Sequence, residues 1–165
     1  LAMLNWGLKQ NEYPVVIRVP LAVTKGGKAE ENYSDLNRYQ VVKEGYKVAI
    51  LALGSFFELG ESVVAKLKEQ GVDATLINPR YITGIDEKLL NDLAKNHQVV
   101  ATLENGELDG GFGEKIASFY GTSTVKVLNF GAKKEFTDRV PYSELMKRYH
   151  LTPEQIVADI MNVLK

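Results

Sequence analysis

Val48-Ala49-Ile50-Leu51-Ala52-Leu53 is the longest unbroken apolar run in the chain. A run of this length is typical of a strand that is covered on both faces, as in a parallel sheet. Ser55 and Glu58 then have the spacing of a capping box, in which the hydroxyl accepts an amide three residues on and the carboxylate reaches back. The helix that they open ends at Gly71, and a strand is predicted over 72–77. Its apolar face consists of Leu59, Val63, Val64 and Leu67.

The alternation of strand and helix continues toward the C-terminus. The further predicted elements are a helix capped by Asp86, a strand over 98–103, a helix over 112–120, a strand over 124–130 and a helix opened by Thr152. Helices between strands imply crossover connections, which place helices on both faces of a mostly parallel sheet. Residues 39–43 and 47–53, joined by Glu44 and Gly45, are expected to form a β-hairpin leading into this sheet. The sequence therefore predicts one three-layer α/β domain from residue 39 to the end.

The first forty residues have a different character. Leu4 and Leu8 lie at helical spacing in a pattern that is already under way at Leu1 without a capping residue, which predicts that the chain begins partway through a helix. Residues 14–19 are rich in β-branched side chains and predict a buried strand. Residues 21–38 contain Gly26 and Gly27 and few large apolar groups, as linkers do. We expect residues 1–20 to be the last helix and strand of a preceding domain, 21–38 to be a linker and 39–165 to be the α/β domain.

Composition limits the function. The chain has 165 residues, 20 Lys and Arg against 21 Asp and Glu, and a formal net charge of −1. We therefore expect neither a nucleic-acid partner nor an anionic membrane partner, because both require a basic surface. The absence of cysteine excludes disulfides, thiolate metal sites and cysteine nucleophiles. No secretory leader pattern is present, which makes the cytoplasm the expected compartment.

The residues that could carry chemistry are few. Glu104 is predicted at the end of a buried strand and Gly110, Gly111 and Gly113 just before a helix, so backbone amides there could hold an anion. The spacing matches neither a dinucleotide fingerprint nor a P-loop, and the favoured alternative is a tight turn with a carboxylate that caps amides. Arg18 interrupts an apolar strand, where a charge needs either a structural partner or a ligand.

Two further residue types remain open to more than one interpretation. Arg80, directly after a strand, could bind a carboxylate or phosphate through its fork, but a structural ion pair is favoured. His97 and His150 stand at predicted helix ends, where a histidine usually complements the helix dipole. No complete set of catalytic residues is visible, so a catalytic site would need a partner domain.

Several blocks together carry a resemblance to a known family. They are 13–20 (Tyr-Pro-Val-Val-Ile-Arg-Val-Pro), 47–54, 77–82 (Ile-Asn-Pro-Arg-Tyr-Ile), 102–106 (Thr-Leu-Glu-Asn-Gly), 110–113 (Gly-Gly-Phe-Gly) and 151–156. In this order they resemble the C-terminal part of the 1-deoxy-D-xylulose-5-phosphate synthases, which are transketolase-like and depend on thiamine diphosphate. The resemblance implies a transketolase C-terminal-like αβα domain, preceded by the last helix and strand of a pyrimidine-binding domain.

The resemblance also implies an activity for a longer parent protein. Such a parent would condense pyruvate with D-glyceraldehyde 3-phosphate, release CO₂ and act as a homodimer. Thiamine diphosphate and Mg²⁺ would be held by the upstream domains, so no catalytic, cofactor or metal residue is expected in this chain and no cofactor is expected to bind to it. The chain itself would be structural and contribute to the dimer interface.

Arg18 matches the first arginine of the family's Arg-x-Pro-Arg-Gly block and is the candidate contact for the substrate phosphate. Leu21 stands where the family has the second arginine, and 138–140 (Asp-Arg-Val) stand where it often has Glu-His-Gly. The alternatives are the C-terminal domain of a transketolase or of a 2-oxoacid dehydrogenase β-subunit, and a non-catalytic binding or assembly module. The Asn-Pro-Arg-Tyr block favours the synthase over the dehydrogenase, whose β-subunits usually have Asp-Leu-Arg there.

Overall fold

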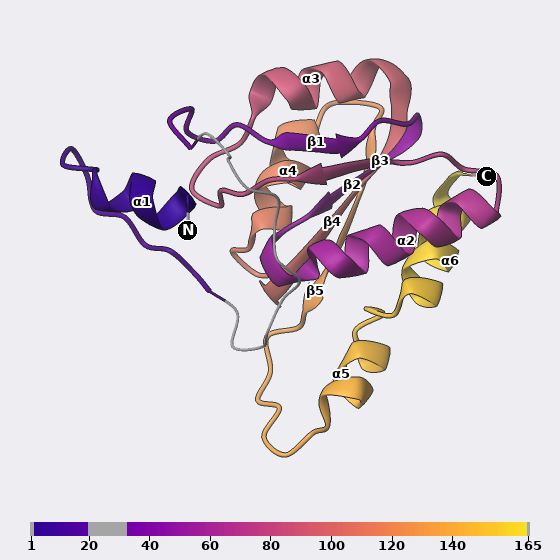
Figure 1. Cartoon of the computed structure of the whole chain (residues 1–165). Coiled ribbons are helices and arrows are strands. Elements are labelled where there is room, and N and C mark those ends of the chain that lie inside the picture. The colour runs from indigo at the N-terminus through magenta and orange to yellow at the C-terminus, as the bar shows by residue number, and fades with distance from the viewer. Residues whose placement is uncertain (1, 20–32, 165) are drawn as a thin grey trace.

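The computed structural model describes residues 2–19 and 33–164, and its body is a five-stranded sheet (Figure 1). The strands are β1 (Gln40–Lys43), β2 (Lys47–Ala52), β3 (Thr75–Asn78), β4 (His97–Glu107) and β5 (Lys126–Ala132). Their order across the sheet is β1-β3-β2-β4-β5, and all neighbours are parallel except β1, which runs antiparallel to β3. The carboxyl ends of the four parallel strands therefore meet at one edge.

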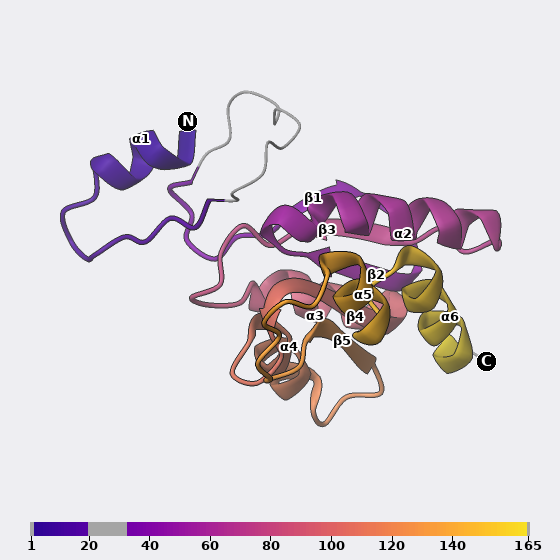
Figure 2. The same ribbon diagram turned by 90° about the horizontal axis from the view of Figure 1, so that it is seen from below.

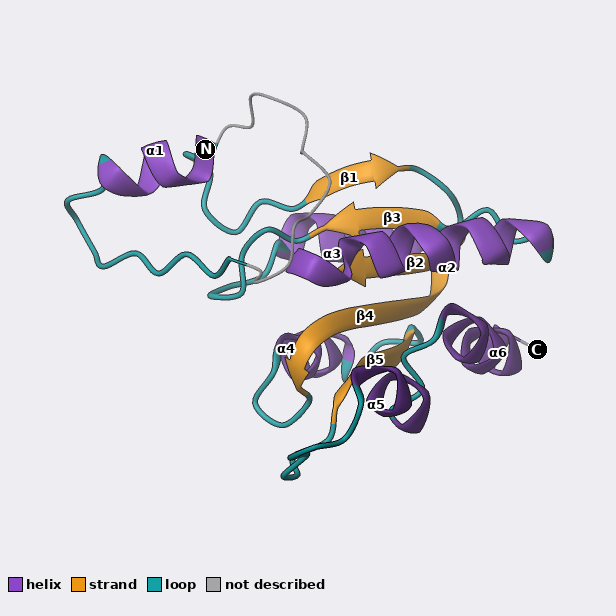
Figure 3. Ribbon diagram, turned by 60° about the horizontal axis from the view of Figure 1, so that its bottom comes forward, coloured by secondary structure: helices purple, strands orange, loops and turns teal. Residues whose placement is uncertain are grey.

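Helices cover both faces of the sheet (Figures 1 and 3). One face is packed by α2 (Phe57–Glu69), α5 (Tyr142–Arg148) and α6 (Pro153–Leu164), and a short 3-10 turn, η1 (Gly54–Phe56), leads into α2. The opposite face is packed by α3 (Glu87–Asn96) and α4 (Phe112–Tyr120). The three-layer α/β prediction is confirmed.

The apolar run of β2 explains the two-sided packing, because successive side chains of a strand point to opposite faces. Val48, Ile50 and Ala52 belong to the cluster under α2 and α6. Ala49 and Leu51 belong to the cluster under α3 and α4. All five are fully buried, so the continuous hydrophobicity of this strand follows from its central place in the sheet.

The predicted hairpin is wrong, because β1 pairs with β3 and not with β2. The connection between β1 and β2 crosses the start of β3 instead of turning back on itself. The amide of Tyr46 donates to the carbonyl of Asp73 (2.8 Å), and a Cβ on Gly45 would lie 2.2 Å from that same oxygen. Gly45 therefore permits a crossing so close that no side chain would fit there.

Helix capping agrees with the sequence at two helices and differs at a third. Asp86 accepts the amide of Leu89 (3.2 Å) at the start of α3, and Thr152 accepts the amide of Gln155 (3.3 Å) at the start of α6. Ser55, however, does not cap α2, which begins after η1 with no side-chain cap. The 3-10 turn shifts the helix start, and the Ser55 hydroxyl accepts from Asn105 Nδ2 (3.0 Å).

The N-terminal segment lies beside the layered body and not within it (Figures 1 and 2). The predicted helix is present as α1 (Ala2–Leu8). The buried strand predicted over 14–19 is wrong: these residues form no strand, and Val16 is 94% exposed. A β-branched run becomes a strand only beside another strand, and none of the described strands pairs with it.

The predicted linker over 21–38 falls mostly outside the described residues, and 33–38 form a loop. Of the helices in 2–19 and 33–164, none is long and apolar enough to cross a membrane.

Candidate functional site

Glu104 lies near the carboxyl edge of the sheet, in β4, and its carboxylate caps α4. Its side chain accepts the amide of Phe112 at Oε2 and the amide of Gly113 at Oε1, both at 2.9 Å. Glu104 is 5% exposed, so these charge-assisted hydrogen bonds are almost completely shielded from solvent. The carboxylate also complements the positive end of the helix dipole. The helix N-terminus thus holds an anion that belongs to the chain itself.

The glycines of the turn make this contact possible. A Cβ on Gly111 would lie 2.6 Å from Glu104 Oε2, and one on Gly113 would lie 2.6 Å from Thr102 Oγ1. Gly110 has a φ of +71° and open space around it, so it serves the backbone turn and not the packing.

All four amides from 110 to 113 have acceptors within the chain. Besides the two amides bound by Glu104, the amide of Gly110 donates to Glu114 Oε2 and that of Gly111 to the Leu108 carbonyl, both at 2.9 Å. Thr102 Oγ1 donates to Asn129 Oδ1 (2.8 Å) beneath the turn and joins β4 to β5. The sequence-predicted residues Glu104, Gly110, Gly111 and Gly113 therefore lie together, in a turn whose amides are bonded internally.

A second buried carboxylate, Asp86, ties the start of β1 to α3. Asp86 Oδ2 accepts the amide of Tyr39 (3.0 Å), and Oδ1 accepts Arg38 Nη1 (3.0 Å) as well as the helix amide of Leu89. The Tyr39 ring packs against Phe112, with centroids 6.2 Å apart, and burial raises the pKa of its hydroxyl. Tyr39 therefore links the two helices of that face.

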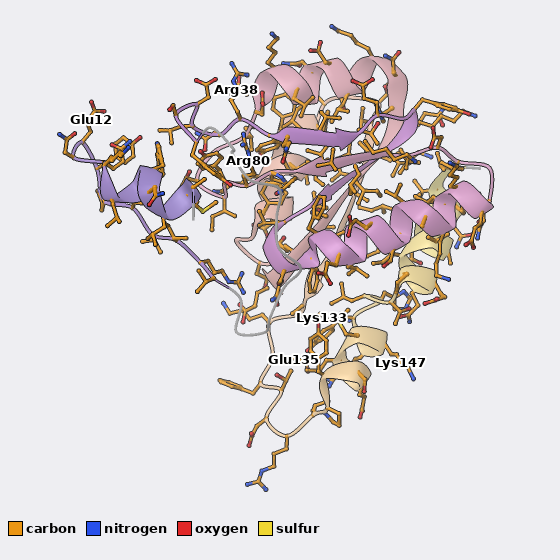
Figure 4. The ribbon with its side chains drawn as sticks, viewed as in Figure 1. Glu12, Arg38, Arg80, Lys133, Glu135 and Lys147 are labelled. Atoms are coloured by element: carbon orange, nitrogen blue, oxygen red, sulfur yellow. The ribbon has the colours of Figure 1, made fainter. Side chains whose placement is uncertain are left out.

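Arg80 lies in the turn after β3, next to Arg38 (Figure 4). Its Nε and Nη2 donate to the Arg38 carbonyl at 3.2 and 2.8 Å. Its guanidinium carbon lies 5.3 and 5.9 Å from the ring centroids of Tyr33 and Tyr81. This geometry fits a structural role for the fork.

Glu135 forms a third polar group, in the loop after β5, near Lys133 and Lys147 in Figure 4. It accepts Arg148 Nη2 and the Tyr149 hydroxyl, each at 2.6 Å, and the second contact raises the pKa of Tyr149. The family departure at 138–140 lies in the same loop, and Arg139 there has a φ of +63°.

The remaining candidates lie apart from these groups. Arg18 is exposed on the extended segment, and within the described residues no ion pair holds it. Leu21 lies outside the described residues. His97 follows α3, where Nδ1 contacts the Leu93 carbonyl (3.0 Å) and Nε2 contacts Thr75 Oγ1 (2.8 Å). His150 pairs with Asp159 (3.0 Å) after α5.

Mg²⁺ with a diphosphate would need free oxygen ligands. Over residues 2–19 and 33–164, no three His, Asp or Glu side chains cluster as a metal site. The buried carboxylates Glu104 and Asp86 are bonded to amides and arginine, and every buried polar side-chain atom in the described part has a partner. The described donor set therefore does not fit thiamine diphosphate and Mg²⁺.

A family model for the transketolase C-terminal domain matches residues 37–156, which include all five strands. The chain belongs to this family. The predicted transketolase C-terminal-like domain is therefore confirmed.

The chain is also similar to curated enzymes of bacteria. It is 31% identical over 98% of its length to the 1-deoxy-D-xylulose-5-phosphate synthase of Clostridium tetani, and 32% identical over 98% to that of Shouchella clausii. In each case the match covers 26% of the relative, so the chain spans about a quarter of their length.

Solved structures share the fold. A structure described as "Split gene transketolase, inactive beta4 tetramer" has a TM-score of 0.71 and 27% identity, over 79% of this chain and 43% of that one. A transketolase from Pichia stipitis has a TM-score of 0.56 and 16% identity, over 78% of this chain and 18% of that one, and shows the fold alone.

The sequence predicts Asp86 only as a helix cap. Its further contacts with Arg38 and Tyr39 are not visible in the sequence, because they join residues 47 or 48 positions apart. A buried carboxylate needs hydrogen-bond donors or a positive charge beside it. The arginine at position 38, just before the first strand, is the one feature of the sequence that indicates such a partner for Asp86.

Proposed function

We propose that the chain is the C-terminal part of a thiamine-diphosphate-dependent synthase that condenses pyruvate with D-glyceraldehyde 3-phosphate, with release of CO₂. The observation that carries this proposal is the similarity over 98% of the chain to two such synthases at 31 and 32% identity. The 78–81 block (Asn-Pro-Arg-Tyr) agrees with it.

In this proposal the chain is a scaffold and contains no reaction centre. The turn of Gly110 to Gly113 uses its amides on Glu104 and other chain groups, which supports a structural role for the edge where α/β domains often bind ligands. Thiamine diphosphate and Mg²⁺ would be held by upstream domains of the parent.

The N-terminal segment supports the proposed division into residues 1–20, 21–38 and 39–165. Leu4, Leu8, Val16 and Val19 are exposed, and so much apolar surface on a short segment is typical of an interface. We infer that a preceding domain of the parent covers these side chains. Arg18, between Val16 and Val19, is the proposed contact for the substrate phosphate.

Self-association is the proposed mode of assembly. It is supported by the similar split-gene transketolase, whose description names a tetramer. A homodimer of the parent is expected, and sedimentation velocity of the parent protein measures it directly.

Product formation by the parent protein tests the activity. With pyruvate, thiamine diphosphate and Mg²⁺, we expect CO₂ release to require glyceraldehyde 3-phosphate. Release that ignores the aldehyde phosphate would mean a different acceptor. For the chain alone, calorimetric titration with thiamine diphosphate should give no measurable heat of binding, whereas micromolar affinity would contradict the scaffold role.

A subunit of a split transketolase, or a module without catalysis, is the second candidate. It is favoured by the likeness to the inactive split-gene protein and by Leu21 in place of the family arginine. Transfer of a two-carbon unit from a ketose phosphate by the parent would support the transketolase. No turnover with either substrate pair would favour the module.

A further inference from the structure

Four side chains from three separate segments meet beside the carboxyl end of β3. They are Trp6 of α1, Tyr33, and Arg80 and Tyr81 of the turn after β3, here called the Tyr81 cluster. The ring centroids of Trp6 and Tyr81 are 6.4 Å apart with an interplanar angle of 83°, and those of Tyr33 and Tyr81 are 6.3 Å apart at 67°. Such edge-to-face pairs contribute more stability than the burial of their apolar surface alone provides. The Tyr81 hydroxyl also donates to the Tyr33 carbonyl (2.9 Å).

Arg80 closes the cluster on the side of the α/β domain. The guanidinium lies against both tyrosine rings and donates twice to the Arg38 carbonyl. The flat face of a guanidinium can stack on an aromatic ring while its N–H groups donate hydrogen bonds in the guanidinium plane. Arg38 is in turn paired with the buried Asp86, so the cluster is joined to the body of the domain.

The backbone of the turn gives Arg80 and Tyr81 their directions. Arg80 has a φ of +62°, which is uncommon for a residue other than glycine. Its amide donates to Asn78 Oδ1 (3.2 Å), and the amide of Tyr81 donates to the Pro79 carbonyl (2.7 Å). A left-handed arginine persists where its surroundings hold it, and here the aromatic rings and the Arg38 carbonyl do so.

The face of α1 that meets the cluster is not its leucine face. Trp6 and Gly7 are half-buried, and a Cβ on Gly7 would lie 3.3 Å from Ile17 Cδ1, whereas Leu4 and Leu8 are exposed. The orientation of the helix is therefore set by Trp6 on Tyr81 and by its contact with Ile17.

We propose that the turn from Asn78 to Tyr81 is a docking site on the α/β domain for the chain's own N-terminal segment. Tyr81 is the central residue of this site, and Trp6 and Tyr33 are the side chains that dock on it. Arg80 joins Tyr33 to Tyr81 by lying against both rings. The inference concerns the joint between two parts of the chain and does not depend on the proposed enzymatic activity.

Trp6 is the single tryptophan of the chain, so its fluorescence reports on this joint directly. We expect Tyr81→Ala to shift the Trp6 emission to longer wavelength and to raise its acrylamide quenching constant by about twofold or more, since the local contact opens. Arg80→Ala should change both readouts in the same direction by a smaller amount. Tyr81→Phe, which keeps the ring, should stay near the wild type.

Tyr142→Ala is the matched control, because Tyr142 is 66% exposed and lies outside the cluster. It should leave Trp6 quenching unchanged. Far-UV circular dichroism and the thermal midpoint separate local opening from unfolding, and if Tyr81→Ala does not fold, Arg80→Ala carries the test. Equal quenching of Trp6 in the wild type and in the folded Tyr81→Ala variant, or in the folded Arg80→Ala variant if that one carries the test, would overturn the proposal.

Discussion

Replacing Glu104 tests whether a self-contained cap holds the turn before α4. Glu104→Ala would leave the amides of Phe112 and Gly113 without their acceptor in a buried place. A hydrogen bond to a charged group contributes about 1.5–3 kcal/mol, so the loss of two should lower the free energy of unfolding by about 3–6 kcal/mol. Because Glu104 is almost fully buried, solvent screening reduces this figure little.

Glu104→Gln is the sharper variant, because it keeps the shape. The carboxamide offers one oxygen and one NH₂ group to two amide donors, so one contact survives and the other becomes donor against donor. We expect a loss of about 1.5–3 kcal/mol. Urea unfolding measures it: with a slope of about 2 kcal/mol/M, a loss of 2 kcal/mol lowers the midpoint by roughly 1 M.

The control is Glu107→Gln, on the same strand but exposed. It should stay within about 0.5 kcal/mol of the wild type, as surface changes usually do. If Glu104→Gln behaved like this control at unchanged slope, the amides would have other acceptors, and the account of the cap would be refuted.

Three further predictions concern packing, pH and capping. Gly113→Ala should lower the free energy of unfolding by about 1–3 kcal/mol in thermal unfolding, because the added Cβ would lie 2.6 Å from Thr102 Oγ1. Gly110→Ala has open space around it and should lower it by only about 1 kcal/mol, through backbone strain. Burial lowers the pKa of His97, so on acidification the unfolded chain binds this proton before the folded chain does. The free energy of unfolding should therefore decrease as the pH drops below about 6.5. His97→Gln should flatten this decrease between about pH 7 and 5. Thr152→Ala should cost about 1 kcal/mol of unfolding free energy at its helix cap, whereas Ser55→Ala, which caps nothing, should cost less in the same urea titration.

Periodicity in the sequence was enough to find the layers. The run from Val48 to Leu53 and the single apolar faces of the helices follow from local sequence, and both lie where they were predicted. Asp86 and Thr152 act within three residues of their partners, so their capping is also a local property. The helix α5 has no side-chain cap, and only Leu145 and Met146 pack against the core, which is why no helix was predicted over 142–148.

Features that depend on distant partners were not predicted from the sequence. The pairing of β1 with β3 depends on which strand lies beside β1 in the fold. The residues Glu44 and Gly45 suit a hairpin turn and a crossing connection equally well, so the sequence does not distinguish the two. Residues 14–19 have strand propensity without a neighbouring strand. For Glu104 the sequence favours an amide cap over an anion site, but the amides that the carboxylate binds could not be named without its distances to the turn.

The two apolar clusters on opposite sides of β2 have an evolutionary consequence. A change of volume at Ile50 falls on the cluster under α2, α5 and α6, and one at Leu51 falls on the cluster under α3 and α4. Substitutions accepted over time should therefore covary in two independent blocks, although the two residues are neighbours in sequence. Each half of the interior can therefore change in sequence without disturbing the packing of the other half.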